Sequence, residues 1–360
     1  MPSVLSPTEL ANLATTIKTW GHSLGFQHVG ISDITLDEHE VYLLNWLTAG
    51  YHGEMDYMAR HGTKRSRPAQ LVPGTLRVIT ARMNYWLSNA ADPWHVLKRP
   101  DLGYISRYAL GRDYHKLLRQ RLQKLAKQIT NAIGAFGYRV FTDSAPVLEK
   151  ALAQKAGLGW IGKHSNLLDR RVGSWFFLGE IYVNLPLPVD QPATAHCGQC
   201  NACLEICPTQ AIIAAYRVDA RRCISYHTIE LRGSIPLQFR RAMGNRIYGC
   251  DDCQLVCPWN RFAQNTVEPD FRIRHRLDAP DLIALFHWDE MEFLRRTEGS
   301  AIRRIGHERW LRNIAVALGN APNTPAVMDA LRMRLTHPSE NVREHVHWAL
   351  AEQAEKKRPT

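Results

Sequence analysis

All eight cysteines of this 360-residue chain lie between positions 197 and 257, and their spacing constrains the fold more than any other feature. The first four form a C-x2-C-x2-C-x3-C-P run made by Cys197, Cys200, Cys203 and Cys207. In two-cluster bacterial ferredoxins, three thiolates of such a run hold one [4Fe–4S] cluster and the fourth reaches the other cluster. The spacing therefore predicts a ferredoxin-like insert that holds two [4Fe–4S] clusters.

The second half of the cysteine block supplies the remaining ligands. It ends in C-x2-C-x3-C-P, which repeats the last three positions of the first run, with Ile247 where the first cysteine would stand. If the fourth ligands are exchanged as in ferredoxins, one cluster is bound by Cys197, Cys200, Cys203 and Cys257. The other is bound by Cys207, Cys223, Cys250 and Cys253. Two zinc sites are the alternative, although zinc does not require the x3-Cys-Pro ending that occurs twice here.

The net charge indicates the kind of partner, and the N-terminal residues indicate where in the cell the protein is expected. The formal net charge of +11 at pH 7 indicates a polyanionic partner, because lysines and arginines that neutralise phosphates release counterions. A basic surface without such a partner is the alternative. Residues 1–10 show neither a secretory signal nor a twin-arginine pair, and no segment offers about 18 uninterrupted apolar residues. We therefore expect a cytoplasmic protein that does not bind a membrane.

Helix and strand patterns alternate through the first 190 residues. A capping box over residues 6–9, with proline at the first helical position, begins a predicted helix of about 18 residues. Further elements are predicted as strands within residues 26–34, 76–86 and 138–141 and as a long amphipathic helix over 117–133. A proline-rich connector over residues 185–192 ends this region. The pattern predicts one α/β domain over residues 1–190.

The rest of the chain divides after the cysteines. We expect the ferredoxin-like module over residues 191–262 and an α-helical domain over residues 263–360. Within the latter, residues 310–320 and 342–352 share an apolar register with small residues, about 32 residues apart, which suggests HEAT-like repeats. An ordinary pair of amphipathic helices fits the same periodicity.

Three polar segments of the α/β region are candidates for chemistry. Asp143 follows the strand predicted over 138–141 and could act as a general acid, although an aspartate before a helix is also a common N-cap. The glycines of residues 157–163 favour a close approach of the backbone to a bulky ligand, or a plain helix-ending turn. Tyr114 and His115 either face a ligand or begin the long helix. No GxGxxG follows a strand, so a dinucleotide site has no local support.

Several segments together resemble the cobalamin-dependent epoxyqueuosine reductases, which complete queuosine in the anticodon loop of tRNA. These segments are residues 111–115, 142–146, 156–164, 222–225 and 244–258. The resemblance covers nearly the whole chain, including the helical tail. The isolated Cys223 is its most telling feature.

The resemblance implies an N-terminal cobalamin-binding domain similar to that of reductive dehalogenases, then the ferredoxin module, then a basic helical domain that helps to hold tRNA. Asp143 matches the proton donor of the family. Other positions fall where the family lines its corrin and substrate pocket, namely Arg65, Ser106, Tyr114, His115, Lys163, His164 and Ser225. Ser106 departs from relatives that carry cysteine here, so no thiol chemistry is expected at this position.

The implied reaction is a two-electron reductive deoxygenation. Electrons pass through the clusters to cobalamin, the cyclopentane epoxide becomes a cyclopentene, and water leaves. Asp143 would deliver a proton to the departing oxygen, which requires a carboxyl pKa raised by a desolvated pocket. The implied partners are tRNA and an electron donor that the sequence does not identify, and the expected assembly is a monomer.

The C-terminal region is the expected grip for tRNA, because an RNA loop presents one modified base while its phosphates are held outside. The candidate arginines are Arg272, Arg274, Arg276, Arg295, Arg296, Arg303, Arg304, Arg309 and Arg312. Solvated helix faces are the alternative for some of them. Two rival functions are a reductive dehalogenase for a small organohalide and a non-catalytic electron-transfer ferredoxin fusion. The first usually carries an export signal, and the second leaves the α/β domain without a purpose.

Overall fold

A four-stranded antiparallel sheet forms the centre of the N-terminal part of the molecule. The computed structural model describes residues 5–356. The strand order is β1-β2-β7-β4, with bounds His28–Ser32, Arg77–Asn84, Phe176–Val183 and Tyr138–Phe141 in that order. Every residue of β7 is buried, because β7 lies inside the sheet and helices cover both faces.

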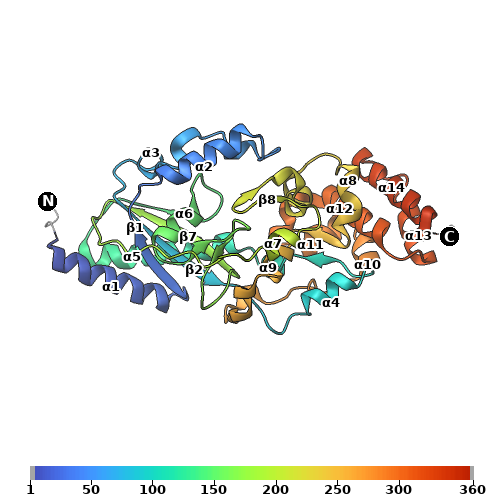
Figure 1. Cartoon of the computed structure of the whole chain (residues 1–360). Helices are drawn as coiled ribbons and strands as arrows, with labels where there is room; N and C mark the ends of the chain where they lie inside the picture. Colours follow the sequence, from blue (N-terminus) through green and yellow to red (C-terminus); the bar gives the residue numbers. More distant parts are fainter. Residues whose placement is uncertain (1–4, 357–360) are drawn as a thin grey trace.

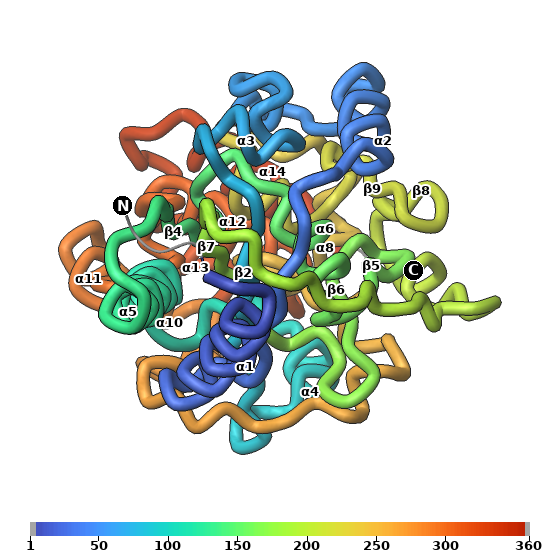
Figure 2. The backbone as a smooth tube through the Cα atoms, turned by 90° about the vertical axis from the view of Figure 1, so that its left-hand side faces the viewer, coloured from blue at the N-terminus to red at the C-terminus, as the bar shows by residue number. Residues whose placement is uncertain are grey.

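Two long helices cover one face of this sheet, and a short one covers the other. α1 (Pro7–Ser23) and α5 (Tyr114–Ile133) pack on the face that carries Ile79 and Met83 of β2. α6 (Glu149–Lys155) packs on the opposite face, which carries Val78. Figure 2 shows α1 and α5 together on one side of β2 and β7, with α6 on the other.

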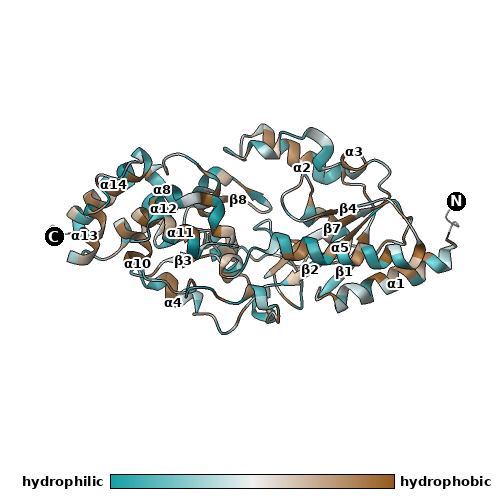
Figure 3. Ribbon diagram, turned by 180° about the vertical axis from the view of Figure 1, so that it is seen from behind, coloured by the Kyte–Doolittle hydropathy of each residue, from teal (hydrophilic) through white to brown (hydrophobic). Residues whose placement is uncertain are grey.

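The predicted elements of this part are confirmed in type and place. The capping box of α1 is present, since the Ser6 hydroxyl accepts the Glu9 N–H and the Glu9 carboxylate accepts the Ser6 N–H. The buried residues of α5 recur with helical spacing at Leu118, Leu122, Leu125, Ala126 and Ile129. Figure 3 shows hydrophobic and hydrophilic residues alternating along α1, α5 and α12, as expected of helices with one buried face.

Shorter elements complete the N-terminal part and form the cysteine region. In the N-terminal part they are α2 (Asp37–Thr48), α3 (Pro68–Leu71), α4 (Pro93–Lys98), β3 (Tyr104–Ile105), β5 (Trp160–Ile161) and β6 (Leu167–Leu168). In the cysteine region they are α7 (Ala202–Glu205), β8 (Ile212–Ala214), β9 (Arg217–Val218), a π-helical turn (Tyr226–Glu230), α8 (Leu237–Met243), β10 (Arg246–Tyr248) and α9 (Asp252–Leu255). The cysteine region lies between the sheet and the C-terminal helices (Figure 1).

The C-terminal end is made of helices. They are α10 (Leu282–Phe286), α11 (Glu290–Arg296), α12 (Gly306–Asn320), α13 (Pro325–Arg332) and α14 (Glu340–Lys356). α12 packs along α14, where a Cβ added to Gly319 would lie 3.1 Å from the Cα of Ala349. The two predicted helices are confirmed, and their HEAT-like character stays a prediction.

The predicted domain boundaries also stay predictions, although one core crosses them. Ile105 and Leu110 pack in the same hydrophobic cluster as Ile247 and Leu311. β10 also pairs in parallel with β3, so the end of the cysteine block is tied to the N-terminal part. None of the helices within residues 5–356 is long and apolar enough to cross a membrane. The cytoplasmic location and the monomeric state stay predictions.

Candidate active site and cluster cavities

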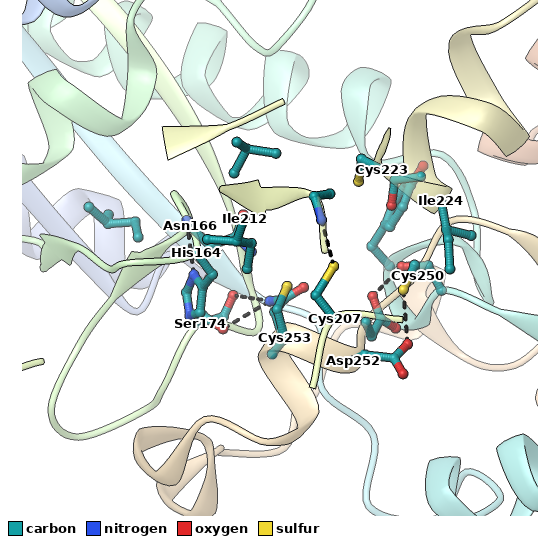
Figure 4. A pocket seen from close by; sticks show the side chains of 18 of the residues that line it. His164, Asn166, Ser174, Cys207, Ile212, Cys223, Ile224, Cys250, Asp252 and Cys253 are labelled. Carbon is teal, nitrogen blue, oxygen red and sulfur yellow. Dashed lines mark hydrogen bonds between the residues drawn. The ribbon is translucent and has the colours of Figure 1, made fainter. Parts of the chain in front are cut away.

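Two cavities lie beside the cysteines, and each is lined by one of the two predicted ligand sets. The large cavity has a volume of about 410 Å³, and its cysteines are Cys207, Cys223, Cys250 and Cys253. The small cavity has a volume of about 220 Å³, and its cysteines are Cys197, Cys200, Cys203 and Cys257. Figure 4 shows the side chains of the first set around the large cavity, with His164 and Ser174 on the side of Cys253, away from Cys223 and Cys250. The fold thus gathers the eight thiols in the grouping that the spacing predicts.

A buried aspartate fixes the loop between Cys250 and Cys253. Asp251 accepts hydrogen bonds from the Tyr104 hydroxyl (2.9 Å), the Ser106 hydroxyl (2.6 Å) and the Arg107 N–H (2.8 Å). Ser106 also lines the large cavity. Its hydrogen bond to Asp251 connects the Cys250–Cys253 loop to the end of β3. Gly249 has a φ of +71°, and a Cβ there would lie 2.6 Å from the Cβ of Ser106, so only glycine fits.

The chemistry of the thiols fits a buried iron centre. Burial raises the pKa of Cys203 to about 11 and the pKa values of Cys250 and Cys253 well above the ordinary thiol value. Thiolates at these positions need the positive charge of a metal to form near neutral pH. Within residues 5–356, no three His, Cys, Asp or Glu side chains converge closely enough to hold a single metal ion. The sulfur atoms surround the two cavities instead.

A second polar group forms where the start of α5 meets the end of β4. The Asp143 carboxylate accepts a hydrogen bond from the Tyr114 hydroxyl at 2.7 Å and lies 3.1 Å from Nε2 of His115. Nδ1 of His115 lies 2.6 Å from the carboxylate of Asp113, which is the N-cap of α5. Tyr114 is held from behind by stacking on Phe177, with ring centroids 3.9 Å apart. We call Asp113, Tyr114, His115 and Asp143 the acid group.

The structure decides two alternatives that the sequence left open. Asp143 is not an N-cap, because α6 begins at Glu149 and its N-cap position is Leu148. Tyr114 and His115 do begin α5, and both also contact Asp143.

The proton of the acid group is held by histidine rather than by aspartate. Burial disfavours the charged imidazolium, but hydrogen bonds to Asp113 and Asp143 outweigh it and raise the pKa of His115 to about 9. Burial would raise the pKa of Asp143, yet the hydrogen bonds from His115 and Tyr114 lower it below the ordinary value. The expectation of a raised Asp143 pKa is therefore wrong, because His115 stabilises the carboxylate.

The other predicted pocket residues fall into three groups. Those that line the large cavity are Ser106, Tyr114, His164 and Ser225. Lys163 and His164 line the small cavity. Arg65, His115 and Asp143 lie outside both linings. Arg65 is buried and donates a hydrogen bond to the Tyr57 carbonyl oxygen at 3.0 Å.

Lys163 and His164 connect the glycine-containing segment to the cysteine loops. The ammonium group of Lys163 donates to the carbonyl oxygen of Cys200 at 2.9 Å and to Oδ1 of Asn201 at 3.0 Å. Burial lowers the pKa of His164 to about 4, so its ring is neutral. Its Nδ1 accepts the Asn166 N–H at 3.1 Å, whereas Nε2 has no partner among residues 5–356. His164 therefore presents an unpaired ring nitrogen in a wall shared by both cavities.

Four polar residues in or near the acid group were not predicted as site residues from the sequence. They are Asp113, Glu149, Lys150 and Glu180. Asp113 had a usable signal, since an aspartate directly before a predicted helix is a common N-cap. Lys150 lines the large cavity beside Tyr114. Glu180 is wholly buried in the middle of β7, where no local pattern marks it.

One of the nine candidate arginines cannot contact tRNA, and others are engaged within the protein. Arg312 is wholly buried and donates to the carbonyl oxygens of Leu231 (2.8 Å) and His227 (2.5 Å). The prediction that Arg312 contacts tRNA is therefore wrong, because this side chain connects α12 to the turn that follows Cys223. Arg304 forms an ion pair with Glu230.

Comparison with known proteins agrees with this geometry. The family model "Epoxyqueuosine reductase QueG, DUF1730" matches residues 65–144, and the model "4Fe-4S double cluster binding domain" matches residues 196–260. The first of these ranges contains the whole acid group.

Full-length relatives point the same way. Epoxyqueuosine reductase from Pseudomonas aeruginosa is 63% identical over 98% of this chain and 97% of the relative. The Escherichia coli K12 enzyme is 61% identical over 98% and 92%. A crystal structure of epoxyqueuosine reductase with an epoxyqueuosine-modified tRNA-Tyr stem loop superposes with a TM-score of 0.87 at 25% identity, over 97% of this chain and 95% of that one. This chain belongs to the epoxyqueuosine reductase family.

Proposed function

We propose that this chain reduces epoxyqueuosine to queuosine in the anticodon loop of tRNA. The epoxide oxygen takes up two electrons and two protons and leaves as water, and a carbon–carbon double bond forms. The observation that carries the proposal is the position of Tyr114, which donates to Asp143 and lines the same cavity as the Cys207 set. Tyr114 therefore links the acid group to the cavity that the Cys207 set lines. The full-length family match favours this reaction over the two rival functions.

We also propose that cobalamin is the redox cofactor that binds at the large cavity. Its walls include the aromatic rings of Tyr85, Tyr108, Tyr114 and Phe177, and His164 adds its unpaired nitrogen. Ser106, Tyr114, His164 and Ser225, which line this cavity, would hold the group. When bound, cobalamin supplies low-valent cobalt as the two-electron donor for carbon–oxygen cleavage.

The acid group holds and delivers one of the two protons that the leaving oxygen needs, and solvent supplies the other. His115 carries a proton at neutral pH because Asp113 and Asp143 stabilise the imidazolium. Asp143 lies between the Tyr114 hydroxyl and Nε2 of His115, so it can receive this proton and pass it to an oxygen atom at the cavity. In this scheme Asp143 is the proton donor and His115 is its reservoir.

The segment before α10 joins the acid group to the proposed tRNA grip. The Arg112 N–H donates to the Asp270 carbonyl oxygen at 2.7 Å, and the Arg274 N–H donates to the Leu110 carbonyl oxygen at 3.0 Å. Arg272 and Arg276 are exposed on this segment. This exposure supports the proposal that their guanidinium groups hold phosphates near the start of α5, which carries Tyr114 and His115.

Replacing Arg272 and Arg276 together with alanine should weaken tRNA binding about 10-fold, because two phosphate contacts are lost. The slope of log affinity against log salt should become shallower by about 0.7 per lost contact. Filter binding of epoxyqueuosine tRNA across a salt series measures both effects. Arg332→Ala, which removes an exposed arginine on α13, is the matched control. An unchanged slope in the double variant would contradict this placement.

The proposed function is tested by product analysis. Anaerobically reconstituted protein with cobalamin, a low-potential reductant and epoxyqueuosine tRNA should yield queuosine after digestion to nucleosides. Omitting cobalamin, or chelating the iron, should abolish the product. If both cofactors are loaded and epoxyqueuosine persists, the assigned reaction is wrong.

A further inference from the structure

Behind the acid group lie two carboxyl side chains that the proposed chemistry does not use. Glu149 is the first residue of α6, and its Oε1 accepts the backbone N–H of Asp143 at 2.5 Å. Glu180 lies in the middle of β7 with no exposed surface, and neither of its side-chain oxygens has a partner among residues 5–356. Strand pairing fixes Glu180 opposite Phe141, two residues before Asp143.

The backbone conformation at Asp143 needs a stabilising interaction from outside its own turn. Its φ is +51°, in the left-handed region that residues other than glycine rarely adopt. The turn around it contains one tight backbone contact, from the Ser144 N–H to the Thr142 carbonyl oxygen at 2.6 Å. In this conformation the Asp143 carboxylate reaches both Tyr114 and His115. The hydrogen bond from the Asp143 backbone N–H to Glu149 stabilises the conformation in which the acid group forms.

Glu180 lies near Glu149 and influences its charge. Burial and the nearby Glu149 carboxyl raise the pKa of Glu180 well above the ordinary carboxyl value, which favours its neutral form. Burial and the charge of Asp143 raise the pKa of Glu149 to about 7, whereas the hydrogen bond from the Asp143 N–H favours its ionised form. Glu149 therefore binds the Asp143 amide on one side and lies near the neutral-favouring Glu180 on the other.

Other charged and titratable groups surround Glu149. Those that influence it or respond to its charge are Arg65, Tyr114, Asp143, Lys150, Glu180 and Tyr182. Lys150 donates to the Ser165 carbonyl oxygen at 2.7 Å, so it is engaged away from Glu149. The Asp143 amide is therefore the donor that a hydrogen bond places on Glu149.

We propose that Glu149, backed by the buried Glu180, is a positioning residue that holds the Asp143 backbone and thereby keeps the Asp143 carboxylate against Tyr114 and His115. The effect of this hydrogen bond on catalysis rests on the proposed function, but its effect on the position of Asp143 does not. Glu149 acts by accepting a hydrogen bond, so a neutral acceptor of the same shape should replace it.

Two variants of Glu149 separate positioning from other roles. Glu149→Ala removes the acceptor, so Asp143 should leave His115 and the pKa of His115 should fall by about one pH unit or more. Glu149→Gln keeps an oxygen acceptor, so the pKa of His115 should stay near 9. Both are read by NMR titration of the full-length holoenzyme with ¹³C-labelled histidine, with the His115 signal assigned from His115→Gln.

Turnover gives the second measurement. Glu149→Ala should lower kcat about 10- to 100-fold, the effect of losing one hydrogen bond to a charged group, with KM for tRNA within about twofold. Glu149→Gln should keep kcat within about threefold of the original protein. Glu38→Ala, which removes an exposed glutamate from the first turn of α2, is the matched control for both measurements.

The outcomes decide between distinct ideas. An unchanged pKa of His115 in a folded Glu149→Ala protein would contradict the proposal that Glu149 positions Asp143. If Glu149→Gln loses turnover as Glu149→Ala does while His115 still titrates near pH 9, Glu149 supplies a proton instead, and positioning is overturned. Failure of the original protein to form queuosine would defeat the proposed function alone, because the His115 titration needs no substrate.

Discussion

Replacing Asp143 with asparagine is expected to lower kcat by about 100- to 10,000-fold, the usual contribution of a positioned general acid. The asparagine oxygen can still accept the Tyr114 hydroxyl hydrogen bond, so the shape of the site is kept. Its amide cannot take up the His115 proton and pass it on. Single-turnover conversion of epoxyqueuosine tRNA measures the loss.

The binding of tRNA provides the control for this variant. Its affinity for epoxyqueuosine tRNA should stay within about twofold, because Asp143 contributes to the chemical step rather than to the phosphate grip. Full turnover in Asp143→Asn would remove the proton-donor role and leave the rest of the proposal standing.

The same variant should change the dependence on pH. The pKa of His115 is raised to about 9, so its stabilising contacts with Asp113 and Asp143 are complete below about pH 6.5, the ordinary histidine value. They are lost as the pH rises through about 9, and turnover should fall there too. Asp143→Asn removes one of the two carboxylates that raise the pKa of His115. The alkaline loss of its residual activity should therefore begin at a lower pH than in the original protein. Rate profiles between pH 6 and 10 test this shift.

The cluster region could be predicted closely because its information is local. The ferredoxin spacing and the count of eight cysteines are enough to divide the thiols into two sets, and two cavities are lined by those sets. Even the distant Cys223 was placed by elimination. Burial and packing add little to a pattern in which seven of the eight cysteines lie within three or four residues of another cysteine.

The acid group could be predicted only in part, because its properties depend on contacts between distant segments. Asp143 and His115 were both named from motifs, but their contact brings the end of β4 to the start of α5. The pKa of each depends on the other, so the location of the proton could not be read from either motif. Glu180 lay in a strand pattern that predicts burial without distinguishing a buried acid from a buried apolar residue.

Arg312 shows the same limit for charge patterns. A run of arginines on helices predicts a basic surface, yet this side chain is buried and bound to backbone carbonyl oxygens. Helical periodicity around Arg312 could not identify a solvent-facing side, since every residue from Trp310 to Gly319 is buried. Arginine composition therefore predicted a nucleic-acid partner better than it predicted which arginines face it.

Replacing Cys223 with serine is expected to remove one cluster and leave the other. Cys223 lines the large cavity with Cys207, Cys250 and Cys253, and none of these lines the small cavity. Iron in anaerobically reconstituted protein should fall from about eight to about four atoms per chain, because each [4Fe–4S] cluster carries four. Queuosine formation should be lost, since the cluster nearest the acid group would be missing.

Cys200→Ser is the matched experiment on the other set, because Cys200 lines the small cavity. It should also leave about four irons, but in the large cavity, so the two variants should differ in their electron paramagnetic resonance spectra after reduction. A Cys223→Ser protein that kept about eight irons, with an unchanged spectrum, would show that Cys223 is not a ligand. The fourth ligand of that cluster would then have to come from outside the cysteine sets, and the division of the eight thiols into two quartets would fail.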